Sequence, residues 1–155
     1  MTAHRYGSRR SALELGTRRK ALIYTVLVVT WLSGAAWLIL HYFLSNRGEF
    51  GVEPNPLEFW MLALHGACAF AFLWLAGWLW TTHIVPWWRG RQRRRASGVT
   101  LIAFGVVLIV SGYLLYYGSG DSLREWTALV HWIVGLAAAI PMLVHAVRSS
   151  RYRRP

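Results

Sequence analysis

Four long stretches of the sequence contain no Asp, Glu, Lys or Arg. They cover residues 21–44, 59–80, 98–117 and 126–147 of a 155-residue chain. An α-helix needs about 20 apolar residues to cross the hydrocarbon core of a membrane, and each stretch meets that length. Backbone polar groups in lipid must bond within their own segment, and these stretches are too uniformly apolar for barrel strands. The chain is therefore predicted to be an all-α integral membrane protein.

The connections between these stretches are short, which predicts antiparallel neighbours and a four-helix bundle. The second and fourth helices then run parallel to each other, from outside to inside. We expect a single four-helix transmembrane domain over residues 1–155, with basic tails at 1–20 and 148–155 and helices at about 21–44, 58–85, 98–117 and 123–147.

The net charge of +11 is concentrated at the ends of the apolar stretches, in RRK at 18–20, RGRQRRR at 89–95 and RSSRYRR at 148–154. The other two connections hold five of the six acidic residues and only two Arg. Cytoplasmic loops are the ones enriched in Lys and Arg, so both termini and the middle connection are predicted to be cytoplasmic. No soluble module remains that could read nucleic acid, and the expected contact of the basic residues is membrane lipid.

Four histidines in the second and fourth stretches form a regular pattern. His65 and His83 are 18 residues apart, which is five turns of an ideal α-helix and about 27 Å. His131 and His145 are 14 residues apart, a little under four turns and about 21 Å. In parallel helices, His65 and His131 fall at similar depth near the outer side, and His83 and His145 near the inner side.

Two imidazoles that face each other at one depth match the two axial positions of a porphyrin iron. Two such pairs predict two bis-histidine haems stacked across the membrane, with electron transfer as their work. Zinc or copper would need three or four converging ligands, yet the stretches contain no carboxylate and Cys68 is the only cysteine. A proton path would also usually include intramembrane carboxylates.

The two histidine spacings differ by four residues, roughly 6 Å along ideal helices, so a distortion is expected. A kink at Pro141 or an irregularity near Pro86 would supply it. Small residues recur in the stretches and fit either close helix packing or room for a flat cofactor; they are Gly34, Gly66, Gly77, Gly105, Gly112 and Gly135.

Three further residues are candidates for supporting roles. His41, near the outer end of the first helix, fits a quinone site, an alternative iron ligand, or an interfacial histidine next to Tyr42. Arg124 lies seven residues before His131, and Arg148 three residues after His145. Both are placed to bind haem propionates, or to anchor the helices by snorkelling.

The motifs LHG and TTH on the second helix, and VHW and LVH on the fourth, are similar to those of a known family. Between about residues 22 and 148 the chain resembles the small bacterial di-haem cytochrome b subunits related to the membrane subunits of formate dehydrogenases and nickel-iron hydrogenases. The resemblance implies two haem b groups, a bacterial cytoplasmic (inner) membrane location and exchange of electrons with the quinone pool. It also implies a hetero-oligomeric complex, with a peripheral redox subunit or a cytochrome c as partner.

Such a protein is an electron-transfer subunit of an oxidoreductase complex rather than a self-sufficient enzyme. The main alternative is a haem-free membrane anchor or assembly subunit, whose basic ends bind anionic lipid or dock a larger complex. An oxygen-activating haem enzyme is the third interpretation. The four paired histidines separate these interpretations, because an anchor needs none of them.

Overall fold

The computed structural model describes residues 16–48, 51–86 and 96–151. In these ranges four helical segments are long and apolar enough to cross a membrane: Arg18–Phe43, Pro56–Ile84, Ser97–Tyr117 and Asp121–Val147. The prediction of four long apolar helical segments is confirmed. The chain divides into two compact units, residues 1–92 and 93–155, which are described separately below.

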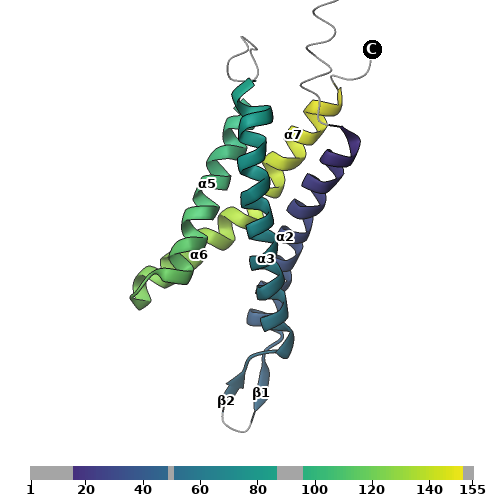
Figure 1. Ribbon diagram of the computed structural model, residues 1–155. Helices are drawn as coiled ribbons and strands as arrows, with labels where there is room; N and C mark the ends of the chain where they lie inside the picture. Colours follow the sequence, from purple (N-terminus) through teal and green to yellow (C-terminus); the bar gives the residue numbers. More distant parts are fainter. Residues whose placement is uncertain (1–15, 49–50, 87–95, 152–155) are drawn as a thin grey trace, which may run out of the picture. The chain divides into compact units, whose positions relative to one another are not determined.

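The first unit consists of two long helices joined by a small hairpin. Helix α2, Thr17–Phe43, lies beside α3, Pro56–Leu79 (Figure 1). The segment that connects them in the sequence forms an antiparallel pair of strands, β1, Asn46–Gly48, and β2, Gly51–Glu53. The hairpin is an addition to the predicted all-α fold. It stands in the polar connection, outside the apolar segments.

Helix α3 begins at Pro56, two residues before the predicted start, because its first turn is strongly capped. The Asn55 side chain accepts a hydrogen bond from the backbone N–H of Leu57, and the Glu58 carboxylate accepts one from the N–H of Asn55, both at 3.0 Å. Pro56 occupies the first helical position, where its missing N–H costs no helical hydrogen bond. This capping box fixes the residue at which α3 starts.

The α3 segment ends in a π-helical turn, η1, Trp80–Ile84, which contains His83. The Thr81 and Thr82 hydroxyls both donate to the carbonyl of Trp78, at 3.1 and 2.8 Å. Such side-chain bonds compete with the backbone hydrogen bonds of an α-helix. Pro86 has no N–H and cannot donate the next backbone hydrogen bond. The distortion expected near Pro86 is therefore present, and it takes the form of a π turn.

The second unit contains α5, Ala96–Tyr117, α6, Asp121–Ala137, and α7, Ala139–Arg151. Helices α5 and α6 lie beside each other, and α7 also contacts α5 (Figure 1). A short connection with Gly120 at φ +106°, which suits glycine, turns the chain between α5 and α6.

The predicted fourth helix, 123–147, is divided into α6 and α7 at Ala138. Pro141 lies four residues after Ala137 and cannot donate the hydrogen bond that an unbroken helix would require there. The kink expected from Pro141 is thus found, as a break in the segment one turn before the proline.

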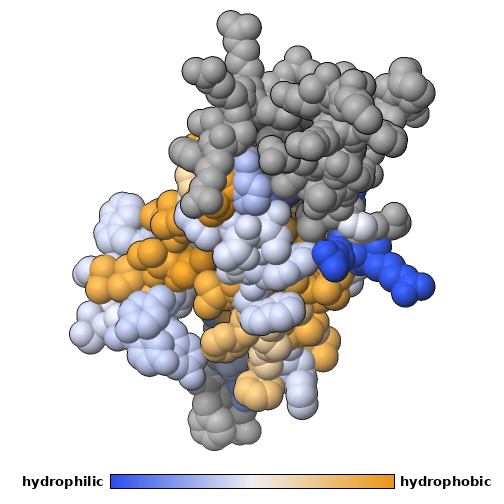
Figure 2. Space-filling view, turned by 45° about the horizontal axis from the view of Figure 1, so that its top comes forward, coloured by the Kyte–Doolittle hydropathy of each residue, from blue (hydrophilic) through white to orange (hydrophobic). Residues whose placement is uncertain are grey.

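Most large apolar side chains of the described helices are exposed, as the apolar colouring in Figure 2 shows. Phe70 is 78% exposed, Trp74 70% and Tyr116 83%, whereas Leu75 is the one buried large hydrophobic residue of the described part of the chain. A helix that is apolar on all sides needs surroundings other than water. Lipid, or another protein surface within the membrane, fits this exposed area.

Candidate functional site

The four candidate iron ligands lie on different elements, and each is half-buried. His65 is in the middle of α3 and His83 is in η1, while His131 is in α6 and His145 is in α7. The predicted pairs each join one residue of the first unit to one of the second. Their pairing stays a prediction, whereas the surroundings of each histidine within its own unit are defined.

His65 is held by the backbone of α2. Its Nδ1 lies 2.8 Å from the carbonyl oxygen of Thr30, which can only accept, so the ring carries its proton on Nδ1. The Ser33 hydroxyl lies 3.3 Å from the same nitrogen and donates its own proton to the Thr30 carbonyl, at 3.0 Å. A neutral imidazole with Nδ1 protonated has its lone pair on Nε2, so Nε2 is the ligating nitrogen of this tautomer.

The His65 ring also rests directly on the α2 backbone at Gly34. A methyl group added at Gly34 would lie 2.9 Å from Cε1 and 3.1 Å from Nδ1 of the ring, closer than carbon atoms normally approach. Gly34 was predicted to serve helix packing or to leave room for a cofactor. In the structure it makes room for the candidate ligand itself.

His131 has the same kind of support from α5. The Ser111 hydroxyl lies 2.8 Å from Nδ1 of His131 and donates its proton to the carbonyl of Val107 at 2.7 Å. When that proton goes to the carbonyl, the serine oxygen accepts the hydrogen bond and the imidazole proton is on Nδ1, as at His65. Ser111 is 5% exposed, so water does not replace this contact freely.

The glycine that follows Ser111 repeats the arrangement at Gly34. A methyl group at Gly112 would lie 3.4 Å from Cε1 of His131, which is closer than most such contacts but less severe than at Gly34. A Ser-Gly dipeptide on one helix and a histidine on the next therefore occur in both units.

His145 is the third histidine with a serine beside Nδ1. The Ser97 hydroxyl lies 3.3 Å from it, and Gly98 follows Ser97 in the sequence. Ser97 also borders a hollow of about 370 Å³ within the second unit, which is otherwise lined by Thr100, Phe104, Ala137, Ile140, Pro141 and Val144. The hollow gives the inner histidine of this unit a largely apolar neighbourhood.

The π turn changes the spacing argument for His83. A π turn accommodates one extra residue, so His83 is about 17 rather than 18 α-helical positions from His65. This removes about one of the four residues by which the two histidine spacings differ. It also rotates His83 by up to about 100° from the face that an unbroken α-helix would give it. The inner pair, His83 and His145, remains a prediction.

The two candidate propionate-binding arginines are placed on helices by the structure. Arg124 lies exposed in the first turn of α6, two turns before His131, with its backbone N–H bonded to the Gly120 carbonyl. Arg148 lies in α7, and the structure describes its backbone but not its side chain. Their role toward propionates stays a prediction.

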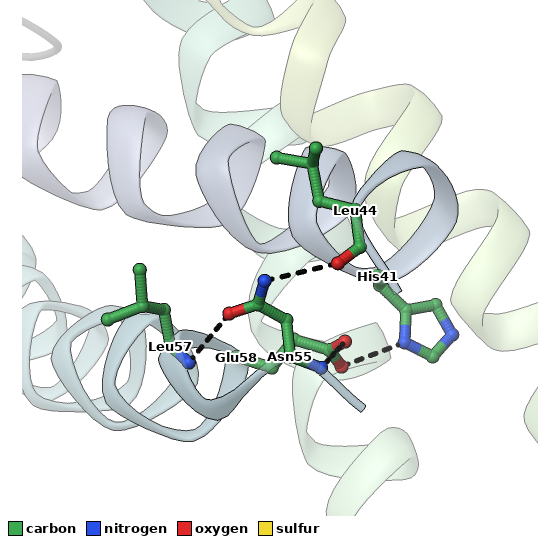
Figure 3. A network of polar contacts seen from close by, with 5 residues as sticks. All are labelled: His41, Leu44, Asn55, Leu57 and Glu58. Carbon is green, nitrogen blue, oxygen red and sulfur yellow. Dashed lines mark hydrogen bonds and ion pairs between the residues drawn. The ribbon is translucent and has the colours of Figure 1, made fainter. Parts of the chain in front are cut away.

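His41 makes a close polar contact that the sequence reasoning missed. Its Nδ1 lies 3.0 Å from Oε2 of Glu58, on the next helix (Figure 3). The imidazole stacks on the Trp37 indole, with ring centroids 4.7 Å apart and planes 12° apart, and meets the Tyr42 ring edge-on. The expected neighbour Tyr42 is thus present, together with a carboxylate partner.

The serines and Glu58 were missing from the predicted site. The sequence signal for the serines is the recurrence of Ser-Gly in the helices, at Ser33 in α2 and at Ser97 and Ser111 in α5, with the contacted histidine always on a later helix. Glu58 was counted only as a charge of the outer connection. Its position 17 residues after His41 identifies the contact only once the hairpin and the cap have fixed where α3 starts.

In the described part of the chain, no three His, Cys, Asp or Glu side chains gather closely enough to hold a metal ion together. The candidate ligands are instead single imidazoles, and in three of them Nδ1 lies within hydrogen-bonding distance of an oxygen atom on another helix. That chemistry fits one axial iron ligand per imidazole, since metal-ligating histidines are oriented by a hydrogen bond from the other ring nitrogen. No family model, curated protein or solved structure matches this chain.

Proposed function

We propose that this chain is a membrane di-haem cytochrome b, which transfers electrons between the quinone pool and a peripheral redox partner. His65 and His131 would ligate the outer haem, and His83 and His145 the inner one. A porphyrin iron with both axial positions filled by imidazole supplies one-electron transfer and has no open position for oxygen or substrate. The function is that of an electron-transfer subunit in a larger oxidoreductase complex.

The observation that carries the proposal is the common support of the histidines. The Nδ1 atoms of His65, His131 and His145 each lie within 3.3 Å of a serine oxygen on a neighbouring helix. For His65 the Thr30 carbonyl, which can only accept, also selects the tautomer that ligates through Nε2. An iron ligand needs its orientation and its tautomer fixed.

The distribution of charge supports the location that goes with this function. The basic clusters at 18–20, 89–95 and 148–154 favour a topology with both termini and the middle connection in the cytoplasm, and the proposed location is a bacterial inner membrane. His65 and His131 then belong to the outer half, and Arg124 lies outward of His131. Arg124 and Arg148 would neutralise haem propionates at the two membrane edges.

The second candidate function is a haem-free anchor or assembly subunit. The exposed apolar surface of α3, with Phe70 and Trp74, favours it because such a surface also suits packing against another membrane subunit. The two candidates differ in whether purified protein contains haem.

The deciding experiment is to purify the full chain in detergent after haem-replete expression. A dithionite-reduced minus oxidised spectrum identifies the haem type, and a pyridine haemochrome assay gives the haem content per chain. We expect close to two b-type haems. One haem would remove the inner pair from the proposal, and a haem-free protein would support the anchor function.

A further inference from the structure

The His41 and Glu58 side chains form an acid–base pair at the hairpin end of the first unit, away from the candidate iron ligands in sequence. The Glu58 carboxylate is held twice, by the backbone N–H of Asn55 at Oε1 and by His41 at Oε2, each at 3.0 Å. Its side chain is only 11% exposed, whereas that of His41 is 45% exposed. The carboxylate is thus the buried member of the pair, and the imidazole is the accessible one.

The carboxylate determines what the imidazole offers to a ligand. An ionised carboxylate only accepts hydrogen bonds, so Nδ1 of His41 donates to it and Nε2 of the neutral ring is an acceptor. Such a ring accepts a hydrogen bond from a hydroxyl group. After it gains a proton, with the carboxylate balancing the charge, it donates to a carbonyl group instead. One side chain can therefore bind both a phenolic hydroxyl and the corresponding carbonyl.

The surroundings of His41 suit a flat, partly apolar ligand. Trp37 and Tyr42 lie around the imidazole, and Phe43 next to them is 80% exposed. Both helices end here, His41 two residues before the end of α2 and Glu58 in the first turn of α3, so the pair lies where the membrane-spanning segments meet the polar connection. Aromatic rings beside one polar group are typical of small-molecule sites, and this position is within reach of the lipid phase.

We infer that His41 and Glu58 bind the head group of a quinone or quinol that enters from the membrane. His41 hydrogen-bonds the ring oxygen of the ligand, and Glu58 is a positioning residue that fixes the imidazole and balances its charge. The inference rests on the proposed function, because that function requires a quinone site, and it names the residues and the membrane face of the site. A metal ion is a poorer fit, since no third His, Cys, Asp or Glu of the described chain joins the pair.

The test is a binding measurement that does not depend on electron transfer. The probe is 2-heptyl-4-hydroxyquinoline N-oxide, a quinol analogue, equilibrated with the full-length protein in detergent and corrected with protein-free micelles. We expect saturable binding of one probe per chain. His41→Phe keeps an aromatic ring next to Trp37 but has no nitrogen, and should weaken binding about tenfold or more, as expected for a lost charge-assisted hydrogen bond.

The matched control is Leu57→Ala, next to Glu58 in the first turn of α3. The Leu57 side chain is 55% exposed, and its backbone N–H, which the Asn55 side chain caps, is unchanged by the substitution. This variant should bind the probe within about twofold of the unchanged protein, because both members of the pair and the α3 cap stay in place. Binding by His41→Phe equal to that of the unchanged protein would overturn the inference. So would an equal loss in Leu57→Ala, since the loss would then not depend on the pair.

Haem content separates this inference from the proposed function. His41→Phe should keep the haem content of the unchanged protein. If that variant does not fold, the probe affinity of Glu58→Gln is compared with that of Leu57→Ala instead. Saturable, His41-dependent probe binding in a haem-free protein would refute the proposed function and leave the site standing. A protein with two haems and no saturable probe binding would support the proposed function and refute the quinone site at His41 and Glu58.

Discussion

Nδ1 of His131 lies 2.8 Å from the Ser111 hydroxyl, and this serine gives its own proton to the backbone of α5. The serine, anchored to its own helix by that bond, orients the imidazole. With its proton on the carbonyl it accepts from Nδ1, and the imidazole proton is then on Nδ1. The same relationship, shared between a serine and a backbone carbonyl, is found at His65 in the other unit.

Removal of either outer ligand should remove the same haem. In the proposed protein, His65→Ala and His131→Ala each lower the haem content from two to one per chain, because a b-type haem that loses one of two axial bonds is poorly retained. The pyridine haemochrome assay measures this directly. Cys68→Ala, on the same helix as His65, is the control and should keep two haems. Retention of two haems in both histidine variants would show that these residues are not a ligand pair.

The serines should tune haem binding unequally. Ser111→Ala leaves the His131 imidazole without its hydroxyl partner, and loss of such an outer-shell contact typically lowers metal affinity by about 10- to 100-fold. Ser33→Ala should have a smaller effect because the Thr30 carbonyl still accepts from His65. Haem titration of the apoprotein gives the two affinities.

The same serine variants should also differ in redox potential. A weaker hydrogen bond at Nδ1 makes the imidazole a poorer electron donor to ferric iron, so the midpoint potential of one haem should become more positive in Ser111→Ala than in Ser33→Ala. A redox titration followed at the haem absorption bands measures it. Equal effects of the two changes would contradict the distinct roles assigned to the two serines.

Gly34 should tolerate no side chain while His65 keeps its place. Gly34→Ala puts a methyl group 2.9 Å from the His65 ring, and overpacking of this kind typically costs about 1–3 kcal/mol. We expect a lower thermal unfolding temperature and weaker binding of one haem. Gly77→Ala is the control, since nothing lies within 4 Å of its added methyl group. Gly112→Ala, at 3.4 Å from His131, should fall between the two.

Carbon monoxide distinguishes a bis-histidine carrier from an oxygen-activating haem enzyme. Iron with two imidazole ligands has no open coordination position, so the dithionite-reduced protein should show no stoichiometric spectral change under carbon monoxide. His131→Ala provides the positive control, because any outer haem that it retains has an open position, whereas its inner haem keeps two imidazole ligands. Stoichiometric binding to the unchanged protein would favour the enzyme.

The sequence predicted the helical spans because uncharged stretches of this length have few other solutions in a membrane. It predicted an irregularity near Pro86 and a kink at Pro141, but not the form that each takes. The π turn depends on two threonine hydroxyls that compete for one carbonyl. The break before Pro141 depends on which residue of the preceding turn departs from the helix when the proline cannot donate its hydrogen bond. The β1–β2 hairpin was missed because its strands of three residues each carry almost no periodic signal.

The candidate site was predictable only in part, for a similar reason. Histidines stand out in apolar helices, but a serine there usually bonds the carbonyl one turn earlier, as Ser111 does with Val107. Its second role, toward His131, depends on how α5 and α6 pack. The contact between His41 and Glu58 likewise depends on two helix ends that the hairpin brings together.

The contacts described above hold His65 against α2, and His131 and His145 against α5. Each half of the chain can therefore set these imidazoles as it folds, before any cofactor arrives. In the proposed protein, haem would meet rings whose rotational freedom is already lost, and its insertion would be the event that fastens two preformed halves to each other. Assembly would then proceed by docking, with the cofactor as the last part to be added.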